Sequence, residues 1–254
     1  MNSAQGESLY FCHIPKTAGT SVRYLLESVV EEDQTYPLSA DIRHPRGYPL
    51  FGDFVGGFVA LPTKPRLVRG HYHLSCGRLL GENAKSLVIF RDPVARVVSE
   101  LKVLVGLQGF GQDRLRRSMD SGIVPNLDNL QTRMVRGDID VAEPNGLSDR
   151  HHLLITEPIG DETRALEEAM AAVSSCGFYG TVEGLGPLMT DVLDYLGAPR
   201  TQVPRENTAE PIDLGLTAVD LELIAERNAL DARLYEEVRK QERARLALSE
   251  ASRT

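Results

Sequence analysis

The chain has 254 residues, a formal net charge of −8, 42% hydrophobic residues and 25% charged residues. These values are typical of one globular α/β domain and exclude a disordered chain, a collagen-like repeat and a disulfide-bonded scaffold. The acidic balance argues against nucleic-acid binding, which depends on basic surface. A local basic pocket in an acidic protein can still bind a small anion.

Neither the first residues nor the cysteines indicate export. The first residues, MNSAQGES, lack a basic stretch followed by an apolar core, so we expect no signal peptide. The longest apolar run, 54–61, contains two glycines and is too short to span a bilayer. Cys12, Cys76 and Cys176 are scattered, odd in number and without a CxxC pair. We therefore expect a cytoplasmic enzyme or binding protein with no integral membrane segment and no structural zinc site.

Short apolar runs alternate with helical patterns along the chain. Strands are predicted over 8–14, 66–70, 86–90 and 177–182. Helices are predicted over 21–32, 94–105, 163–173, 185–196 and 217–248, whereas 106–128 and 138–150 have the composition of irregular surface segments. The alternation predicts one α/β domain over 1–254, with a mainly parallel sheet flanked by helices. Its core is expected over 8–238, and 239–254 forms the helix end and tail.

Residues 13–21 (HIPKTAGTS) join the first predicted strand to the first helix. A helix start offers unpaired N–H groups, which bind phosphate well, and a lysine beside it adds charge. The segment therefore predicts a P-loop-like anion site, the alternative being a plain helix cap with a surface lysine. It differs from the nucleotide-binding GxxxxGK[ST] loop, because Lys16 precedes Gly19 instead of following it.

Arg91 and Ser99 form a second candidate site. Arg91 follows the strand 86–90, and Ser99 lies about two turns into the next helix. An arginine and a hydroxyl in this arrangement can hold a second phosphate. The alternative is an arginine paired with Asp92 and a serine that faces water.

The string HIPKTAGTS followed by FRDPVARVVSE resembles the paired cofactor loops of the sulfotransferases. The similarity is to the branch of the heparan-sulfate and uronyl 2-O-sulfotransferases with their bacterial relatives. Further segments agree with this family, and the resemblance extends over 8–238. These segments are VRGH at 68–71, NLQTRM at 129–134, YGTVE at 179–183 and the helical stretch 223–235.

The resemblance implies a donor, 3′-phosphoadenosine-5′-phosphosulfate (PAPS), bound by three segments. The first loop would bind the 5′-phosphosulfate through Lys16, Thr17, Ala18, Gly19, Thr20 and Ser21. Arg91 and Ser99 would bind the 3′-phosphate. Arg205 and Thr208 fall where the family has a late loop over the cofactor.

The acceptor hydroxyl must lose a proton, so a base must lie near it. His71 is the leading candidate, because it ends a strand at the sheet edge where ligands bind and matches the family's catalytic histidine. His73, two residues on, is the alternative base or a substrate-binding residue. Lys16 would also neutralise charge on the leaving oxygen. Arg133 either orders the wall of the site, binds an acidic acceptor or forms a surface ion pair.

The sequence therefore predicts a sulfotransferase that acts on an alcohol of a carbohydrate or glycoconjugate, with a small-molecule or carbohydrate acceptor as its partner. No metal is expected, because a sulfuryl group carries less charge than a phosphoryl group. Two alternatives stay open: a P-loop-like nucleotide kinase, which would need magnesium, and a nucleotide-binding protein without catalysis.

Overall fold

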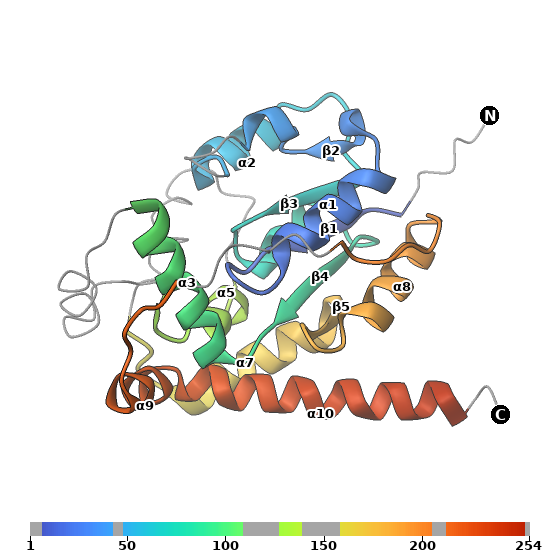
Figure 1. The fold of residues 1–254 in the computed structure, drawn as a ribbon. Helices are drawn as coiled ribbons and strands as arrows, with labels where there is room; N and C mark the ends of the chain where they lie inside the picture. The colour runs from blue at the N-terminus through green and yellow to red at the C-terminus, as the bar shows by residue number, and fades with distance from the viewer. Residues whose placement is uncertain (1–6, 43–47, 109–126, 139–157, 205–211, 252–254) are drawn as a thin grey trace.

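The computed structural model describes residues 7–42, 48–108, 127–138, 158–204 and 212–251. Five parallel strands form one sheet in the order β2-β3-β1-β4-β5 (Figure 1). The strands are β1 (Leu9–Cys12), β2 (Thr35–Tyr36), β3 (Leu67–Gly70), β4 (Lys85–Phe90) and β5 (Gly177–Thr181). The predicted α/β fold with a parallel sheet flanked by helices is confirmed.

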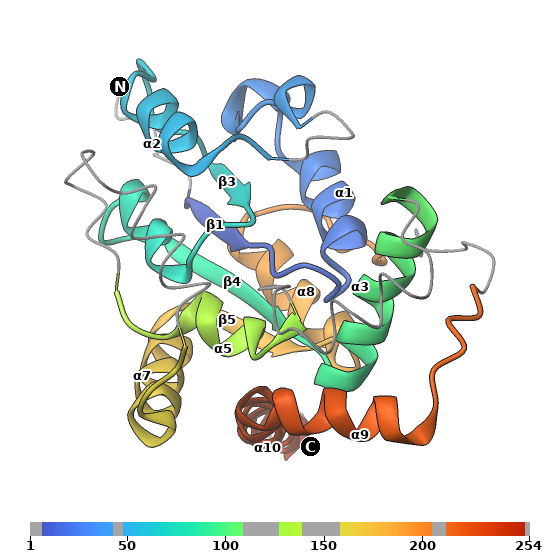
Figure 2. The same cartoon turned by 90° about the vertical axis from the view of Figure 1, so that its left-hand side faces the viewer.

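Helices cover both faces of this sheet (Figure 2). They are α1 (Gly19–Val29), α2 (Phe51–Val59), α3 (Pro93–Gln108), α5 (Leu130–Val135), α7 (Glu162–Ser175), α8 (Leu185–Tyr195), α9 (Ala218–Arg227) and α10 (Ala229–Ala251). Three 3₁₀ helices accompany them: η1 (Glu32–Gln34), η2 (Ser39–Asp41) and η3 (Leu74–Leu80). None of the described helices is long and apolar enough to cross a membrane.

The side chains of each strand alternate between two hydrophobic cores. Leu9 and Phe11 of β1 pack with α1 and α8 on one face of the sheet. Tyr10 and Cys12 face the other core, which α2, α5, α7 and α10 complete. The strands are short and apolar because both faces are covered, which is typical of parallel sheets.

The structure corrects two expectations about the helices. The helix predicted over 217–248 is divided at Asn228, whose buried side chain donates to the Ile224 carbonyl and ends α9. The capping pair Thr217 and Asp220 does begin α9. Helix α2 was missed because its sequence contains three glycines. Its aromatic residues nevertheless pack into the core, and this tertiary contact outweighs the low helix propensity of glycine.

The carboxyl ends of the strands place the predicted site segments at one edge. Cys12 pairs with Gly70 on one side and Val88 on the other, and β4 runs on to Phe90 beside Thr181. The chain leaves β1 toward β2 and leaves β4 toward β5, in opposite directions along the sheet. The crevice between the ends of β1 and β4 is therefore a topological switch point, where open parallel sheets bind ligands.

Candidate functional site

The segment between β1 and α1 is a tight turn. Lys16 and Ala18 have φ values of 68° and 64°, in the left-handed region that residues other than glycine rarely adopt. Inside the turn, the Thr17 hydroxyl donates to the Ile14 carbonyl at 2.9 Å, so this hydroxyl holds the turn rather than facing outward. Such backbone strain persists only where the surrounding structure enforces it.

Gly19, the first residue of α1, makes room for the ring of His13. A Cβ atom at Gly19 would stand 1.9 Å from that imidazole. The ring cannot simply move aside, because it stacks on Phe11 and lies 4.3 Å from the His71 ring, centroid to centroid. His13 also bonds through Nδ1 to the Tyr48 hydroxyl, at 3.1 Å. A residue larger than glycine would therefore displace the start of α1.

Helix α1 differs from the other helices that begin near this edge. Asp92 accepts the Ala95 N–H at the start of α3, at 2.8 Å. Asp231 accepts the first N–H groups of α5, and the Glu242 carboxylate lies against Gly184 at the start of α8. Helix α1 has no side-chain cap and no acidic residue in its first turn. Because a helix start carries partial positive charge, this first turn, which has no acidic residue of its own, favours an anion.

Lys16 and Arg91 bring the two predicted loops together. Arg91 Nη1 donates to the Lys16 carbonyl at 3.1 Å, which joins the end of β4 to the turn after β1. Burial lowers the pKa of Lys16; Glu100 on α3 raises this pKa, and Arg91 lowers it further. Two cations thus share the switch point at the start of α1. Ser99, the other residue predicted for the second phosphate, lies in α3, the helix that follows Arg91, and its role stays a prediction.

His71 is held in one tautomer. Its Nδ1 lies 2.6 Å from the His13 carbonyl oxygen, which can only accept, so the proton is assigned to Nδ1. In the neutral ring, Nε2 then carries a lone pair. Burial lowers the pKa of His71 to about 4, against the smaller opposing effect of the His13 carbonyl. His71 is therefore neutral at pH 7 and able to accept a proton at Nε2.

His73 has both ring nitrogens occupied. Nε2 bonds to the Arg136 carbonyl at 2.8 Å, and Nδ1 accepts the Ser75 N–H at 3.2 Å at the start of η3. The side chain is fully buried. These contacts leave neither nitrogen to receive an acceptor proton, and so the structure favours His71 over its neighbour as the base.

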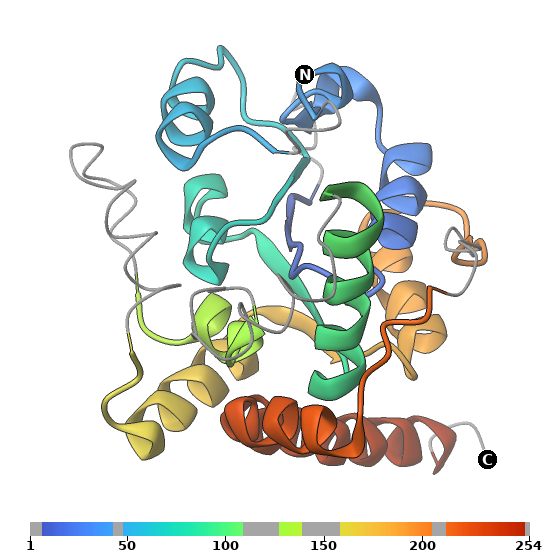
Figure 3. The same ribbon diagram turned by 60° about the vertical axis from the view of Figure 1, so that its left-hand side comes forward.

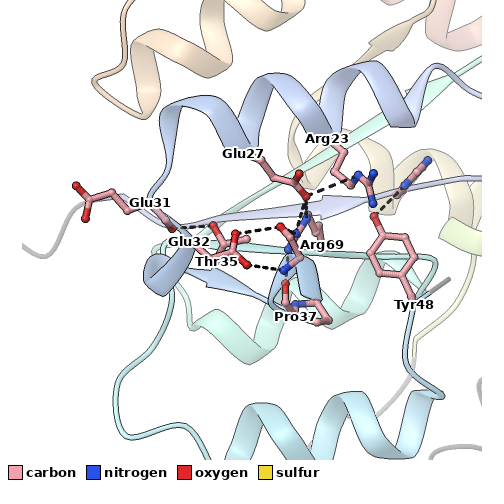
Figure 4. Close-up of polar contacts among 10 residues, drawn as sticks. Arg23, Glu27, Glu31, Glu32, Thr35, Pro37, Tyr48 and Arg69 are labelled. Atoms are coloured by element: carbon pink, nitrogen blue, oxygen red, sulfur yellow. Dashed lines mark hydrogen bonds and ion pairs between the residues drawn. The ribbon is translucent and has the colours of Figure 1, made fainter. Parts of the chain in front are cut away.

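Arg69, two residues before His71, links β3 to helix α1 and to Pro37 (Figure 4). This fully buried guanidinium donates from Nε to Glu27 of α1 at 2.7 Å and bonds to the Pro37 carbonyl. Tyr48, drawn in the same figure, packs against His71, and the centroids of the two rings lie 4.7 Å apart. Helix α1 and the end of β3 are thereby fixed relative to each other.

Of the remaining predicted residues, some lie in the described part of the chain and others lie outside it. Arg133 is buried and donates from Nε to the Asp128 carbonyl at 2.8 Å, which is the contact of a residue that orders the chain and not of a surface ion pair. Thr20 and Ser21 lie in the first turn of α1. Arg205 and Thr208 lie outside the described residues.

Sequence reasoning assigned no role to four residues at this edge: His13, Gln131, Asp231 and Glu242. His13 and Gln131 were quoted within motifs, at 13–21 and 129–134, and the place of His13 after a strand, like that of His71, was an available signal. Gln131, Asp231 and Glu242 meet their partners through the tertiary fold, across about forty to one hundred residues. Sequence spacing carries no signal for such contacts.

A cavity of about 410 Å³ adjoins the site at the end of β5. Thr181, Glu183, Tyr235 and Arg239 are among its lining residues. The Val182 N–H bonds to the Phe90 carbonyl, so this cavity begins one residue from Arg91 in the neighbouring strand. A larger cavity of about 570 Å³ lies near the start of β4, and no predicted site residue lines it.

No family model matches the chain, and a search of curated proteins finds no match. Among the residues that the structure describes, no cluster of three or more His, Cys, Asp or Glu side chains is arranged to hold a metal ion. The chemistry of the site therefore has to be argued from its own residues.

Proposed function

We propose that this protein is a sulfotransferase that moves a sulfuryl group from PAPS to a hydroxyl of a carbohydrate or glycoconjugate. The observation that carries the proposal is the start of α1 at the switch point. Its first turn has no side-chain cap and no acidic residue, whereas Asp92 and Asp231 accept N–H groups at the starts of α3 and α5. Helix dipole and Lys16 together favour an anion there.

Arg91 supports a donor with two separate anionic groups. Its guanidinium reaches the Lys16 carbonyl through Nη1 and lies at the end of the next strand. A ligand with a phosphosulfate on α1 and a 3′-phosphate near Arg91 would use both cations. The cavity at the end of β5 adjoins this position and offers space for the nucleoside.

In the proposed reaction, the acceptor oxygen attacks sulfur from the side opposite the phosphate. A new oxygen–sulfur bond forms as the bond between sulfur and the bridging oxygen breaks, and adenosine 3′,5′-bisphosphate leaves. The acceptor proton passes to Nε2 of His71, and Lys16 offsets the charge that grows on the bridging oxygen. Bound phosphosulfate is expected to raise the pKa of His71, because a nearby anion favours the protonated ring. The base is thus strengthened when the donor is in place.

Two further parts of the proposal concern setting and partners. The three cysteines are free and buried, which supports a reducing compartment and the proposed cytoplasmic location. The partner is a small-molecule or carbohydrate acceptor, and no nucleic acid is proposed as a ligand.

Transfer of labelled sulfate from PAPS is expected to continue in excess EDTA. The positive groups proposed to stabilise the leaving oxygen belong to the chain itself, so removing divalent cations should leave the rate unchanged. The measurement is product formation on a panel of sugar acceptors, with and without chelator. If EDTA stops turnover, magnesium restores it and ATP replaces PAPS as the donor, the protein is a nucleotide kinase instead.

A further inference from the structure

The buried side chain of Gln131 binds the backbone of Arg91 at two points. Its Oε1 accepts the Arg91 N–H at 2.8 Å, and its Nε2 donates to the Arg91 carbonyl at 2.9 Å. A primary amide offers a donor and an acceptor side by side, which suits the N–H and carbonyl of one residue. Gln131 therefore continues the hydrogen bonding of β4 one residue beyond the strand, at the position from which the Arg91 side chain departs.

Gln131 is itself held by a buried junction between α5 and α10. Asp231, at the start of α10, accepts the Gln131 N–H at 3.0 Å and the Thr132 N–H at 2.7 Å. Asn129, just before α5, in turn binds the start of α10, because its Oδ1 accepts the N–H groups of Leu230 and Asp231. The starts of α5 and α10 thus cap each other, and the side chains of Gln131, Thr132 and Asp231 are fully buried.

The junction is joined to the base of α3 as well. Burial raises the pKa of Asp231, while Arg96 of α3 and the bonds from Thr132 and Gln131 lower it. Figure 3 shows that one end of α3 packs against α10. The end of β4 is therefore enclosed by α3, α5 and α10, and Gln131 is the side chain that connects this enclosure to Arg91.

We infer that Gln131 is a positioning residue for the donor: it fixes the Arg91 backbone so that the guanidinium spans the space between the Lys16 carbonyl and the 3′-phosphate. The inference rests on the proposed function. Gln131 acts through Arg91 and does not touch the nucleotide. Without the amide, the Arg91 side chain would depart from a loosely held backbone and lose its fixed direction.

The test compares two nucleotides, adenosine 3′,5′-bisphosphate and adenosine 5′-monophosphate, which differ only in the 3′-phosphate. In Gln131→Met, which keeps the length and loses both hydrogen bonds, affinity for the bisphosphate is expected to fall about tenfold. Affinity for the monophosphate should change by less than about twofold, because α1 and Lys16 are untouched. The readout is the ratio of the two dissociation constants from calorimetry, which a general loss of stability does not change.

Thr132→Val is the matched control. It removes the buried bond from the Thr132 hydroxyl to Asp231, in the same junction, without touching Arg91. We expect a lower unfolding temperature and an unchanged ratio. In the Arg91→Ala background, Gln131→Met should have no further effect on the ratio, as required of a residue that acts through Arg91.

The outcomes separate the two claims. If the wild type prefers the bisphosphate and Gln131→Met keeps that preference, or Thr132→Val loses it equally, the positioning role is overturned and the proposed function stands. If the wild type shows no preference, the assignment of the donor site fails, and the positioning role with it. Should Gln131→Met not fold, Gln131→Leu decides by the same ratio, since it also removes both hydrogen bonds to Arg91 and adds no charge.

Discussion

Replacing His71 with alanine is expected to lower the single-turnover rate of sulfuryl transfer by about 10²–10⁴-fold, the usual contribution of a general base. Affinity for adenosine 3′,5′-bisphosphate should stay close to that of the wild type, because His71 comes from β3 and α1 holds the donor. The physical reason is the fixed tautomer, in which the His13 carbonyl occupies Nδ1 and leaves Nε2 for the acceptor proton. Rapid-quench kinetics with saturating labelled donor measures this rate.

The pH dependence of kcat/KM provides a second readout of the same residue. Only neutral His71 is a base, and its neutral form is lost as the pH falls through its pKa of about 4. The value of kcat/KM for PAPS, which reports the enzyme before the donor binds, should therefore be nearly flat from pH 8 to about pH 5. An ordinary histidine, with a pKa near 6.5, would already lose about tenfold at pH 5.5. Circular dichroism at each pH verifies that the protein is folded.

His73→Ala is the comparison that could contradict this assignment. The His73 ring is buried and bonded at both nitrogens. We therefore expect His73→Ala to unfold at a lower temperature than the wild type and to lose less turnover than His71→Ala. If His73→Ala folds and is inactive while His71→Ala turns over normally, the base lies two residues further along the chain.

Lys16→Ala is expected to impair both binding and chemistry. Loss of a charged hydrogen bond worth about 1.5–3 kcal/mol would weaken the affinity for PAPS about 10- to 150-fold. The rate at saturating donor should fall as well, because the same ammonium is proposed to face the leaving oxygen. Titration calorimetry and single-turnover kinetics separate these two effects.

Lys240→Ala controls for the change in net charge. Replacing this exposed lysine of α10 removes the same charge at a position away from the switch point. Donor affinity and rate should therefore both stay at wild-type values. A Lys16→Ala protein that binds PAPS as tightly as the wild type would contradict the placement of the phosphosulfate at α1.

The sequence predicted the sheet better than the helices around it. Each predicted strand is present, because a short apolar run between turn residues can hardly be anything else in a chain of alternating elements. The break at Asn228 was not predicted, since the apolar stripe continues through it and the Asn228 side chain that ends α9 is also held by the N–H of Asn129, far away in sequence. Helix α2 was missed for the opposite reason: its glycines suppress a local signal that tertiary packing overrides.

The candidate site could be predicted only where its residues follow strand ends. Lys16, His71 and Arg91 all do, and topology alone brings them to one edge. The contact between Arg91 and the Lys16 carbonyl and the choice between His71 and His73 depend on three-dimensional hydrogen bonds. The carboxylate at the start of α5 is that of Asp231 in α10, about one hundred residues away in sequence. The contrast that distinguishes α1 therefore emerges only in the folded chain.

Calorimetric titration of the wild-type protein with adenosine 3′,5′-bisphosphate and with adenosine 5′-monophosphate tests the central claim most directly. If the start of α1 and Arg91 bind two separate anionic groups, the bisphosphate should bind about 10- to 150-fold more tightly, as one charged hydrogen bond of about 1.5–3 kcal/mol requires. Arg91→Ala should abolish most of that difference. Equal affinities for the two nucleotides in the wild type would contradict the account.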